Sequence, residues 1–315
     1  MEHLKNSTQQ IESYRRILLS LYPEVKQITE NIPTYNPEYP FIADIPAQII
    51  AHLCKNDTQK ITQAIQGYIH FCDTFKQKQI EFVRNKVYAY QDFAQVNAEV
   101  YQNKAYMTQI YYPALLFSYL FSSNYFEILR IFLQIFIPLT QQKQGKTCEI
   151  GIGHGLLSSL LLKNNPHLQG IGIDISPVAR EVTDQVSQFL GLSPIPVRIE
   201  DATQAISQKE NAVMICAEVL EHLPNPEKLL QSIYAALDEG GLLFLTASIN
   251  MESVDHLYLF QSDEEVVSMV EGTGFKVLER RVAFLTAQNY RNDERLQQRL
   301  MKRRNPCTSV LILSK

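Results

Sequence analysis

Hydrophobic and polar positions follow two different patterns along the chain, and the change between them falls near residue 141. Before it, apolar residues recur at helical spacing, most clearly in the range 127–138. The apolar side chains there fall at i, i+3, i+4 and i+7, which forms one stripe on a helix. They are Leu129, Phe132, Leu133 and Phe136. Further segments with helical spacing are 8–21, 46–54, 58–85 and 90–103.

The range 31–46 interrupts this helical part with four prolines. Proline pushes the residue before it out of the helical region, so we expect an extended loop there. The aromatic residues of this range, Tyr35, Tyr39 and Phe41, suit either a lid over a binding site or a plain connector.

Short β-branched runs alternate with helices in the second part of the chain. The predicted strands are 147–152, 170–174, 196–200, 212–217, 242–248, 276–284 and 309–314. This alternation predicts a parallel sheet with helices on both faces. The last two strands lack a crossover helix of the usual kind and predict a hairpin-like edge. Ser176 before Pro177 and Asn225 before Pro226 are expected to cap the N-termini of two helices.

Together the two patterns predict an α/β protein of two domains. We expect residues 1–140 to form a mostly helical N-terminal domain that covers the substrate, mediates dimerisation or does both. We expect residues 141–315 to form the domain that binds a cofactor.

The composition is that of an ordinary globular protein, with 45% hydrophobic and 20% charged residues. Lys and Arg number 12 against 12 Asp and Glu in residues 1–140, and 17 against 21 in residues 141–315. Neither part has the basic excess that favours binding to phosphate backbones. The charge pattern therefore argues against a nucleic-acid substrate without excluding one.

Cysteine usage and the N-terminus predict a cytoplasmic protein. The five cysteines are scattered without a CxxC pair, which fits a reducing compartment better than a disulfide framework or a zinc site. The first ten residues lack the apolar core of a secretion signal. The longest uncharged stretch, 105–126, contains several polar residues and a proline, so we expect no membrane contact.

A glycine-rich turn follows the first predicted strand, at Gly151, Gly153 and Gly155. Glycine has no Cβ, so a ligand can approach the backbone closely, and the next helix offers free N–H groups. Leu156 departs from the GxGxxG fingerprint of dinucleotide-binding proteins.

Two acids follow at the ends of the next two strands. Asp174 lies 21 residues after Gly153 and can accept both hydroxyls of a ribose, whereas Asp201 can meet the amine of an adenine. A glycine turn and two acids at three successive strand ends are more specific evidence for a nucleoside-binding site than any one of these features alone. The alternative is a flavodoxin-like or dehydrogenase domain with incidental acids.

These motifs resemble the class I S-adenosylmethionine (SAM)-dependent methyltransferases over residues 146–315. The matching segments read CEIGIGHG, GIDIS, EDA and CAEVLEHLPNPEKLL. The resemblance implies a Rossmann-like sheet of seven strands with the last one antiparallel, and SAM as cofactor. It implies that the SAM-binding residues are Glu149, Gly151, Gly153 and Gly155 for the methionine part, Asp174 and Ile175 for the ribose, Asp201 and Ala202 for the adenine, and Glu218 nearby.

The ExxEH segment, Glu218 to His222, follows the fourth strand and lies beside the expected methyl group. With His256 after the fifth strand, its side chains would suit Mg, Mn, Fe or Zn. The segment resembles two subgroups: ubiquinone-biosynthesis O-methyltransferases and small-RNA 3′-terminal 2′-O-methyltransferases. This resemblance implies the metal ligands Glu218, Glu221, His222 and His256.

A metal-free site is the alternative, because an EHL segment occurs in family members without a known metal. The acid and the histidine would then orient the substrate or cap a helix. In that case His222 or His256 would act as the catalytic base that takes the acceptor's proton. With a metal, a bound hydroxyl would react as an alkoxide or phenoxide.

The expected acceptor is a small hydroxylated molecule, with specialised metabolism as the expected setting, because aromatic residues crowd the range 105–126. Most of these rings would equally suit a core or a dimer contact. Alternatives are N-methylation of an amine or peptide, RNA 2′-O-methylation, and a SAM-binding scaffold without activity. The basic end of 287–306 is expected to be a solvated helix face.

Overall fold

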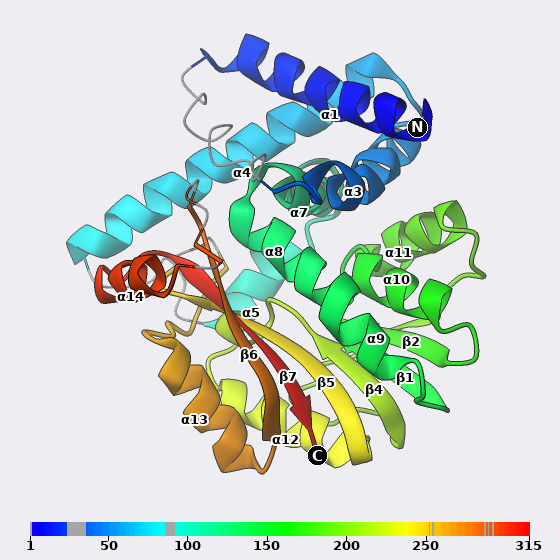
Figure 1. The fold of residues 1–315 in the computed structure, drawn as a ribbon, viewed down its shortest axis with the longest axis vertical. Helices are drawn as coiled ribbons and strands as arrows, with labels where there is room; N and C mark the ends of the chain where they lie inside the picture. The colour runs from blue at the N-terminus through cyan, green and yellow to red at the C-terminus, as the bar shows by residue number, and fades with distance from the viewer. Residues whose placement is uncertain are drawn as a thin grey trace.

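The computed structural model describes residues 2–23, 36–85, 92–251, 253, 255–286, 288, 290–291 and 293–315. Within them, seven strands form one sheet in the order β3-β2-β1-β4-β5-β7-β6 (Figure 1). The strands are β1 Lys146–Ile150, β2 Gln169–Asp174, β3 Val197–Ile199, β4 Asn211–Cys216, β5 Leu237–Ile249, β6 Lys276–Phe284 and β7 Cys307–Ser314. Strand β7 runs antiparallel to both β5 and β6, and the other pairs are parallel. The predicted sheet and its antiparallel edge are confirmed.

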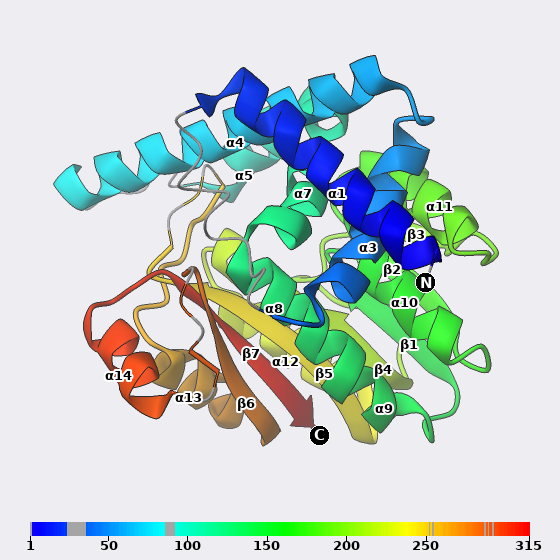
Figure 2. The ribbon, with the colours of Figure 1, turned by 45° about the horizontal axis from the view of Figure 1, so that its top comes forward.

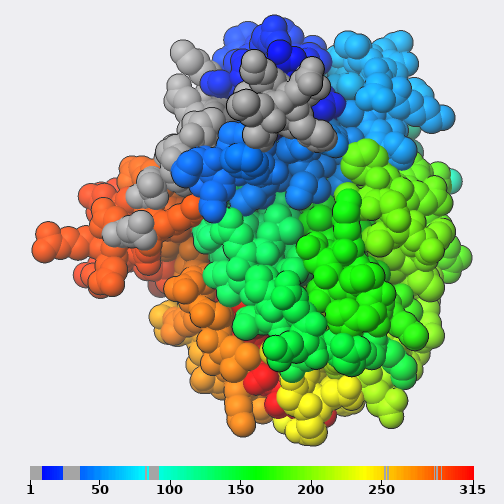
Figure 3. Space-filling model, turned by 45° about the vertical axis from the view of Figure 1, so that its right-hand side comes forward, coloured from blue at the N-terminus to red at the C-terminus, as the bar shows by residue number. Residues whose placement is uncertain are grey.

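Helices cover both faces of this sheet. Five belong to the second part of the chain: α10 Leu156–Asn164, α11 Val178–Phe189, α12 Pro226–Ala236, α13 Asp263–Thr273 and α14 Glu294–Lys302. Alternate residues of β4 explain the two layers: Val213 and Ile215 point to the core shared with α10 and α11, whereas Met214 and Cys216 point to the core shared with α12 and α13. The segment around α14 projects from the side of the molecule (Figure 3).

The N-terminal helices gather at the edge where the parallel strands end, and α8 and α9 run across one face of the sheet (Figures 1 and 2). The longer ones are α1 Glu2–Leu21, α3 Tyr39–Leu53, α4 Thr58–Asn85, α7 Tyr112–Phe121 and α8 Ser123–Ile131. The short ones are α5 Phe93–Val96, η2 Asn97–Tyr101, α6 Lys104–Tyr106, η3 Met107–Tyr111, η4 Phe132–Phe136 and α9 Ile137–Thr140. One apolar cluster continues from Leu18 through Phe117 to Phe244 of the sheet.

The extended loop expected at 31–46 is wrong from Tyr39 onward, where α3 begins; residues 31–35, with Tyr35, lie outside the described part. Pro40 stands in the first turn, where its missing N–H costs no helical bond. Pro46 is inside the helix and is tolerated because α3 is held by its buried apolar face. Phe41 points to solvent, with 58% of its surface exposed.

One of the two predicted helix caps is correct. Asn225 accepts the Lys228 N–H and caps α12. Ser176 does not cap α11: the cap position is Pro177, and the Ser176 hydroxyl donates instead to the Tyr101 carbonyl at 2.8 Å. The Ser176 hydroxyl therefore makes a tertiary hydrogen bond to Tyr101 in place of the cap on α11 that the local pattern predicted.

Across the described ranges, no single helix is long and apolar enough to cross a membrane. Two consecutive helical stretches, Lys104–Phe121 and Ser123–Thr140, are together long and apolar enough for a span, but they are bent by 83° relative to each other.

Candidate active site

A cavity of about 220 Å³ lies at the carboxyl ends of the central strands. Strands β1 and β4 mark the point where the strand order reverses, which is where open α/β sheets bind ligands. Every residue predicted for the site lines this cavity except Gly155. The lining set includes Glu149, Gly151, Gly153, Asp174, Ile175, Asp201, Ala202, Glu218, Glu221, His222 and His256.

The turn after β1 has a backbone conformation that favours glycine. Gly151, Gly153 and Gly155 have φ angles of +66°, +54° and +71°. A Cβ on Gly151 would lie 2.5 Å from Val219 Cγ2, and one on Gly155 would lie 2.6 Å from Thr183 Cγ2. Bare backbone therefore faces the cavity at Gly151 and Gly153, whereas Gly155 allows α10 to pack closely against α11.

Glu149 supports this turn from inside the protein. Its Oε2 accepts the Ser158 main-chain N–H at 2.9 Å, so the carboxyl group caps the first turn of α10. Burial raises the pKa of Glu149 to about 8, although the bonds from Ser158 oppose this shift. The cap fixes the N-terminus of α10, with its positive dipole end, beside the cavity.

The two acids predicted at the strand ends are already held by the backbone. Asp174 accepts the Gly153 N–H at 2.9 Å and the Ser176 N–H at 2.8 Å. Burial raises the pKa of Asp174, against the effect of these bonds. Asp201 accepts the N–H and the hydroxyl of Thr203 at 2.9 and 2.6 Å. Carboxylate oxygens have further lone pairs, so both side chains can still accept a bond from a ligand.

Glu218 follows β4 in a backbone conformation that non-glycine residues rarely adopt, with a φ of +55°. Its two carboxylate oxygens accept the hydroxyls of Thr246 and Ser248, both at 2.7 Å. Its main-chain N–H donates to Thr246 Oγ1 at 2.9 Å. Strand β5 therefore holds this strained residue in place at the edge of the cavity.

Glu221, His222 and His256 form a cluster, in which one ligand atom from each lies within 4.8 Å of the others. Three of the four predicted metal ligands thus converge, and Glu218 is not part of the cluster. Both carboxylate oxygens of Glu221 are buried without a hydrogen-bond partner among the described residues. Burial, followed by the charge of Glu218, raises the pKa of Glu221 to about 8. Leaving a buried carboxyl unpartnered is costly, which fits a site that a ligand completes.

Both histidines of the cluster are oriented through Nδ1. His256 Nδ1 lies 3.0 Å from the Met251 carbonyl oxygen, and His222 Nδ1 lies 3.2 Å from the Asp255 carbonyl oxygen. A carbonyl can only accept, so each Nδ1 carries the proton and each Nε2 is left for the cavity. Burial lowers the pKa of His256 to about 4. Burial also lowers the pKa of His222, but Asp255 and Glu221 outweigh it and the net shift is upward.

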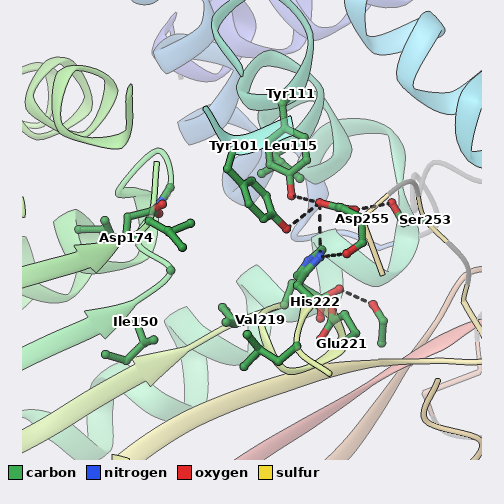
Figure 4. Close-up of a pocket in the computed structure, with 18 of the residues that line it drawn as sticks. Tyr101, Tyr111, Leu115, Ile150, Asp174, Val219, Glu221, His222, Ser253 and Asp255 are labelled. Carbon is green, nitrogen blue, oxygen red and sulfur yellow. Dashed lines mark hydrogen bonds and ion pairs between the residues drawn. The ribbon is translucent and has the colours of Figure 1, made fainter. Parts of the chain in front are cut away.

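Asp255 is the main functional candidate that sequence reasoning missed. Its Oδ2 lies 3.3 Å from His222 Nδ1 and accepts the hydroxyls of Tyr101 and Tyr111 at 3.1 and 2.9 Å (Figure 4). Its Oδ1 accepts the Ser253 hydroxyl at 3.0 Å. Its position directly before His256 was the available signal, but the two tyrosines lie too far away in sequence to be paired with it.

The aromatic residues expected on the substrate side divide into two groups. Four tyrosines line the cavity: Tyr111, Tyr112, Tyr119 and Tyr125. The phenylalanines are core residues instead: Phe117, Phe121 and Phe126. Tyr106 packs against the edge of that core and does not line the cavity. The rings of this range that line the cavity therefore all carry hydroxyl groups, and Phe71, Phe75 and Phe93 from earlier helices add apolar rings to the same wall.

The segment around Tyr101 lies against the strand tip that carries Asp174. Gln102 Nε2 donates to the Ile175 carbonyl at 3.0 Å, and Ser176 Oγ donates to the Tyr101 carbonyl at 2.8 Å. Figure 4 shows Asp174 on one side of the cavity and the His222–Asp255 pair on the other, with Tyr101 reaching toward the latter. Residues from the N-terminal helices thus close one side of the cavity.

Comparison with known proteins agrees with this geometry. A family model described as a methyltransferase domain matches residues 121–282, about half of the chain. The chain belongs to this family of methyltransferase domains and has the fold of the class I SAM-dependent methyltransferases, so the flavodoxin-like and dehydrogenase alternatives are wrong.

The curated relatives are proteins named ubiquinone biosynthesis O-methyltransferase. The one from Glaesserella parasuis is 32% identical over 130 residues, 40% of this chain and 54% of the relative. The one from Pseudomonas savastanoi pv. phaseolicola is 23% identical over 125 residues, again 40% of this chain and 53% of the relative. The chain thus spans about half the length of these relatives.

A solved structure has a similar fold over a larger part of the chain than the curated relatives match. A putative O-methyltransferase from Nostoc punctiforme aligns with 81% of this chain and 72% of its own, with a TM-score of 0.51 and 14% identity. Its coverage reaches beyond the sheet into the N-terminal helices, since the sheet and its helices alone span a smaller share of the chain.

Proposed function

We propose that this protein transfers the methyl group of SAM to a hydroxyl of a small molecule. The observation that carries this proposal is the cluster of Glu221, His222 and His256 beside the glycine turn. Two ring nitrogens and an unpartnered carboxyl can hold a hydroxyl or take its proton. The names of the curated relatives, which are O-methyltransferases, support the same class of acceptor.

The strand tips suit SAM. The glycine turn after β1 has no room for a side chain at Gly151, and its backbone is free to contact the methionine part of SAM. Asp174 would accept the ribose hydroxyls, with Ile175 beside it, and Asp201 would accept the adenine amine. When bound, SAM supplies a methyl group that is already activated by its sulfonium.

A divalent metal fits the cluster, and we propose the ligands Glu221 Oε, His222 Nε2 and His256 Nε2. The unpartnered carboxyl oxygens and the two fixed Nε2 atoms are the donors that Mn, Fe or Zn prefer, and they are less suited to Mg. A metal there would lower the pKa of an acceptor hydroxyl. Glu218, whose oxygens are bound by Thr246 and Ser248, would act on the cofactor side.

Without a metal, His222 is the better base of the two histidines. The pKa of His256 is lowered to about 4, so its imidazole binds a proton weakly. The pKa of His222 is raised by Asp255 and Glu221, after the opposing effect of burial, and a stronger base takes a hydroxyl proton more readily.

The cavity wall favours an acceptor with an aromatic or apolar body. Tyr111, Tyr119 and Tyr125 come from the N-terminal helices and face the strand tips across the cavity. Rings of this kind suit a flat molecule, and the cluster of Glu221, His222 and His256 would bind its hydroxyl. N-methylation of an amine is the second candidate, and a role in specialised metabolism is compatible with either.

A methyl-transfer assay with and without a chelator tests these proposals. Purified protein is incubated with SAM and a panel of catechols, phenols and amines, and S-adenosylhomocysteine release is measured. We expect activity with a hydroxylated ring, loss with EDTA, recovery with Mn²⁺ or Zn²⁺, and at least a tenfold loss in Glu221→Gln. Activity on amines alone, or indifference to EDTA, would overturn the O-methyl or the metal proposal respectively.

Binding of S-adenosylhomocysteine by calorimetry separates the cofactor site from the acceptor site. Asp174→Ala should weaken binding at least tenfold, because a half-buried hydrogen-bond acceptor for the ribose is lost. Glu239→Ala removes a carboxylate whose side chain is 85% exposed and should leave binding unchanged. Equal affinities in the two variants would remove Asp174 from the cofactor site.

We further propose that two copies associate through the N-terminal helices. Phe41 of α3 and Ile80 of α4 are 58% and 43% exposed, and a second copy would cover these apolar side chains. A single-chain mass by light scattering, at the concentration used for the assay, would rule this out. A nucleic-acid acceptor is not favoured, given the absence of a basic excess in either part of the chain.

A further inference from the structure

Asp255 is the most heavily bonded side chain of the cavity that has no assigned role. It is 1% exposed, and its carboxylate accepts three hydroxyls and faces the His222 ring nitrogen. A buried carboxylate with this many donors has one orientation. It is therefore a rigid acceptor placed directly against His222.

The Nδ1 atom of His222 faces a single residue, Asp255. Both the carbonyl oxygen and the Oδ2 of Asp255 face its Nδ1, at 3.2 and 3.3 Å. The ring also packs edge-to-face against Tyr101 and His256, with centroids 6.3 and 4.9 Å apart. These contacts fix the tautomer and the plane of the imidazole, so that Nε2 is the nitrogen that faces the cluster.

Two of the three hydroxyl donors to Asp255 come from a distant part of the chain. Tyr101 and Tyr111 are the last residues of the π-helical turns η2 and η3, and their hydroxyls reach the same Oδ2. The carbonyl of Tyr101 also accepts the Ser176 hydroxyl, next to the strand tip that carries Asp174. The same tyrosine thus contacts the cofactor side and the histidine side of the cavity.

We propose that Asp255 is a positioning residue for His222 and that the hydroxyls of Tyr101 and Tyr111 complete its site. The orientation of His222 then depends on the docking of the N-terminal segment over the strand tips. Lifting that segment removes two donors from the carboxylate and lets it turn toward solvent, which frees the imidazole. This inference rests on the proposed function, since it assigns His222 a working orientation there.

Nuclear magnetic resonance of the full chain, labelled with ¹⁵N-histidine and kept free of metal at one pH, tests the proposal. The His222 Nδ1–H signal, identified by its loss in His222→Gln, should exchange slowly with water in the wild type. We expect exchange at least tenfold faster in Asp255→Asn and in the double variant Tyr101→Phe, Tyr111→Phe. Unchanged exchange in both would overturn the proposal.

Two controls keep the result interpretable. The His256 Nδ1–H, bonded to the Met251 carbonyl, reports in the same spectrum whether the site has kept its fold. Tyr39→Phe removes a buried hydroxyl bonded to the Leu120 carbonyl in the same helical region and should change neither signal. If a variant loses both signals, the single variants Tyr101→Phe and Tyr111→Phe are measured instead. We expect the His222 Nδ1–H to exchange faster in each of them, by less than in the double variant. An unchanged exchange rate in both single variants would contradict the proposal.

A second measurement separates this inference from the metal proposal. With Co²⁺ alone as probe, Asp255→Asn should bind at least tenfold more weakly than the wild type, because the ligand ring is no longer fixed. If Co²⁺ does not bind the wild type at all, the metal proposal fails while the exchange result on His222 still stands. Fast exchange with unaltered Co²⁺ affinity would limit the role of Asp255 to the metal-free protein.

Discussion

At the scale of single residues, burial decides the charge of Glu149. The pKa of its carboxyl rises from 4.5 to about 8 because it is removed from water, and the N–H of Ser158 offsets only part of that cost. The folded protein therefore holds a proton here that the unfolded chain releases above pH 4.5. Stability from this group is present below that pH and is lost as the pH rises through about 8.

Glu149→Gln should remove this dependence while keeping an oxygen for the Ser158 N–H. We expect the variant and the wild type to differ little near pH 5. Near pH 8 the variant should gain stability on the order of a few kcal/mol. Urea unfolding at both pH values, with EDTA present, measures the difference. A stability difference that is the same at pH 5 and pH 8 would show that Glu149 is ionised in the folded protein.

The sequence predicts single residues well where they stand next to a strand end. Asp174 and Asp201 could be proposed because a parallel sheet brings strand ends to one edge. Asp255 could not, because its partner Tyr101 is 154 residues away and the pairing depends on how the helices dock. Local pattern also cannot tell that Ser176 gives its hydroxyl to Tyr101 and not to a helix.

At the scale of elements, the strands were predictable and several helical details were not. Strand β6 has the bounds expected from its pattern, and the other strands differ from theirs by a few residues. The first half of helix α3 was missed because proline signals a loop locally, whereas a buried face outweighs that signal; its second half lies in the helix predicted at 46–54. The π turns η2 and η3 have no sequence signature, although they set the direction of Tyr101 and Tyr111.

Close contact between α4 and η3 depends on Gly67. A Cβ there would lie 2.4 Å from the Gln109 carbonyl oxygen, which is backbone and cannot move aside cheaply. Gly67→Ala should therefore cost about 1–3 kcal/mol of stability and push η3, with Tyr111, away from its place. Calorimetric melting of the variant measures the loss.

Gly272→Ala is the matched control, because the same change is made in α13 with nothing within 4 Å of the added atom. Alanine has the better helix propensity, so this variant should gain about 0.5 kcal/mol. Two variants that melt alike would mean that α4 and η3 do not approach each other this closely in solution.

At the scale of the whole molecule, the two parts of the chain share one core. Phe132 and Phe136 of η4 pack on Phe244 of β5, with ring centroids 5.0 and 5.2 Å apart. All three rings are fully buried. The family model also begins at residue 121, before this helical stretch, so the helix that covers the sheet belongs with the methyltransferase fold.

A fragment of residues 141–315 should therefore fold poorly even though it contains the whole sheet. Removing Phe132 and Phe136 exposes the apolar face around Phe244, and lost burial of two aromatic rings costs several kcal/mol. We expect a broad urea transition and binding of a hydrophobic dye. The fragment 121–315 keeps both rings and should unfold at higher urea. A sharp transition of 141–315 at the same midpoint as the intact chain would mean that the sheet is stable without the helices that cover it, and that the boundary near residue 141 is also a boundary of folding.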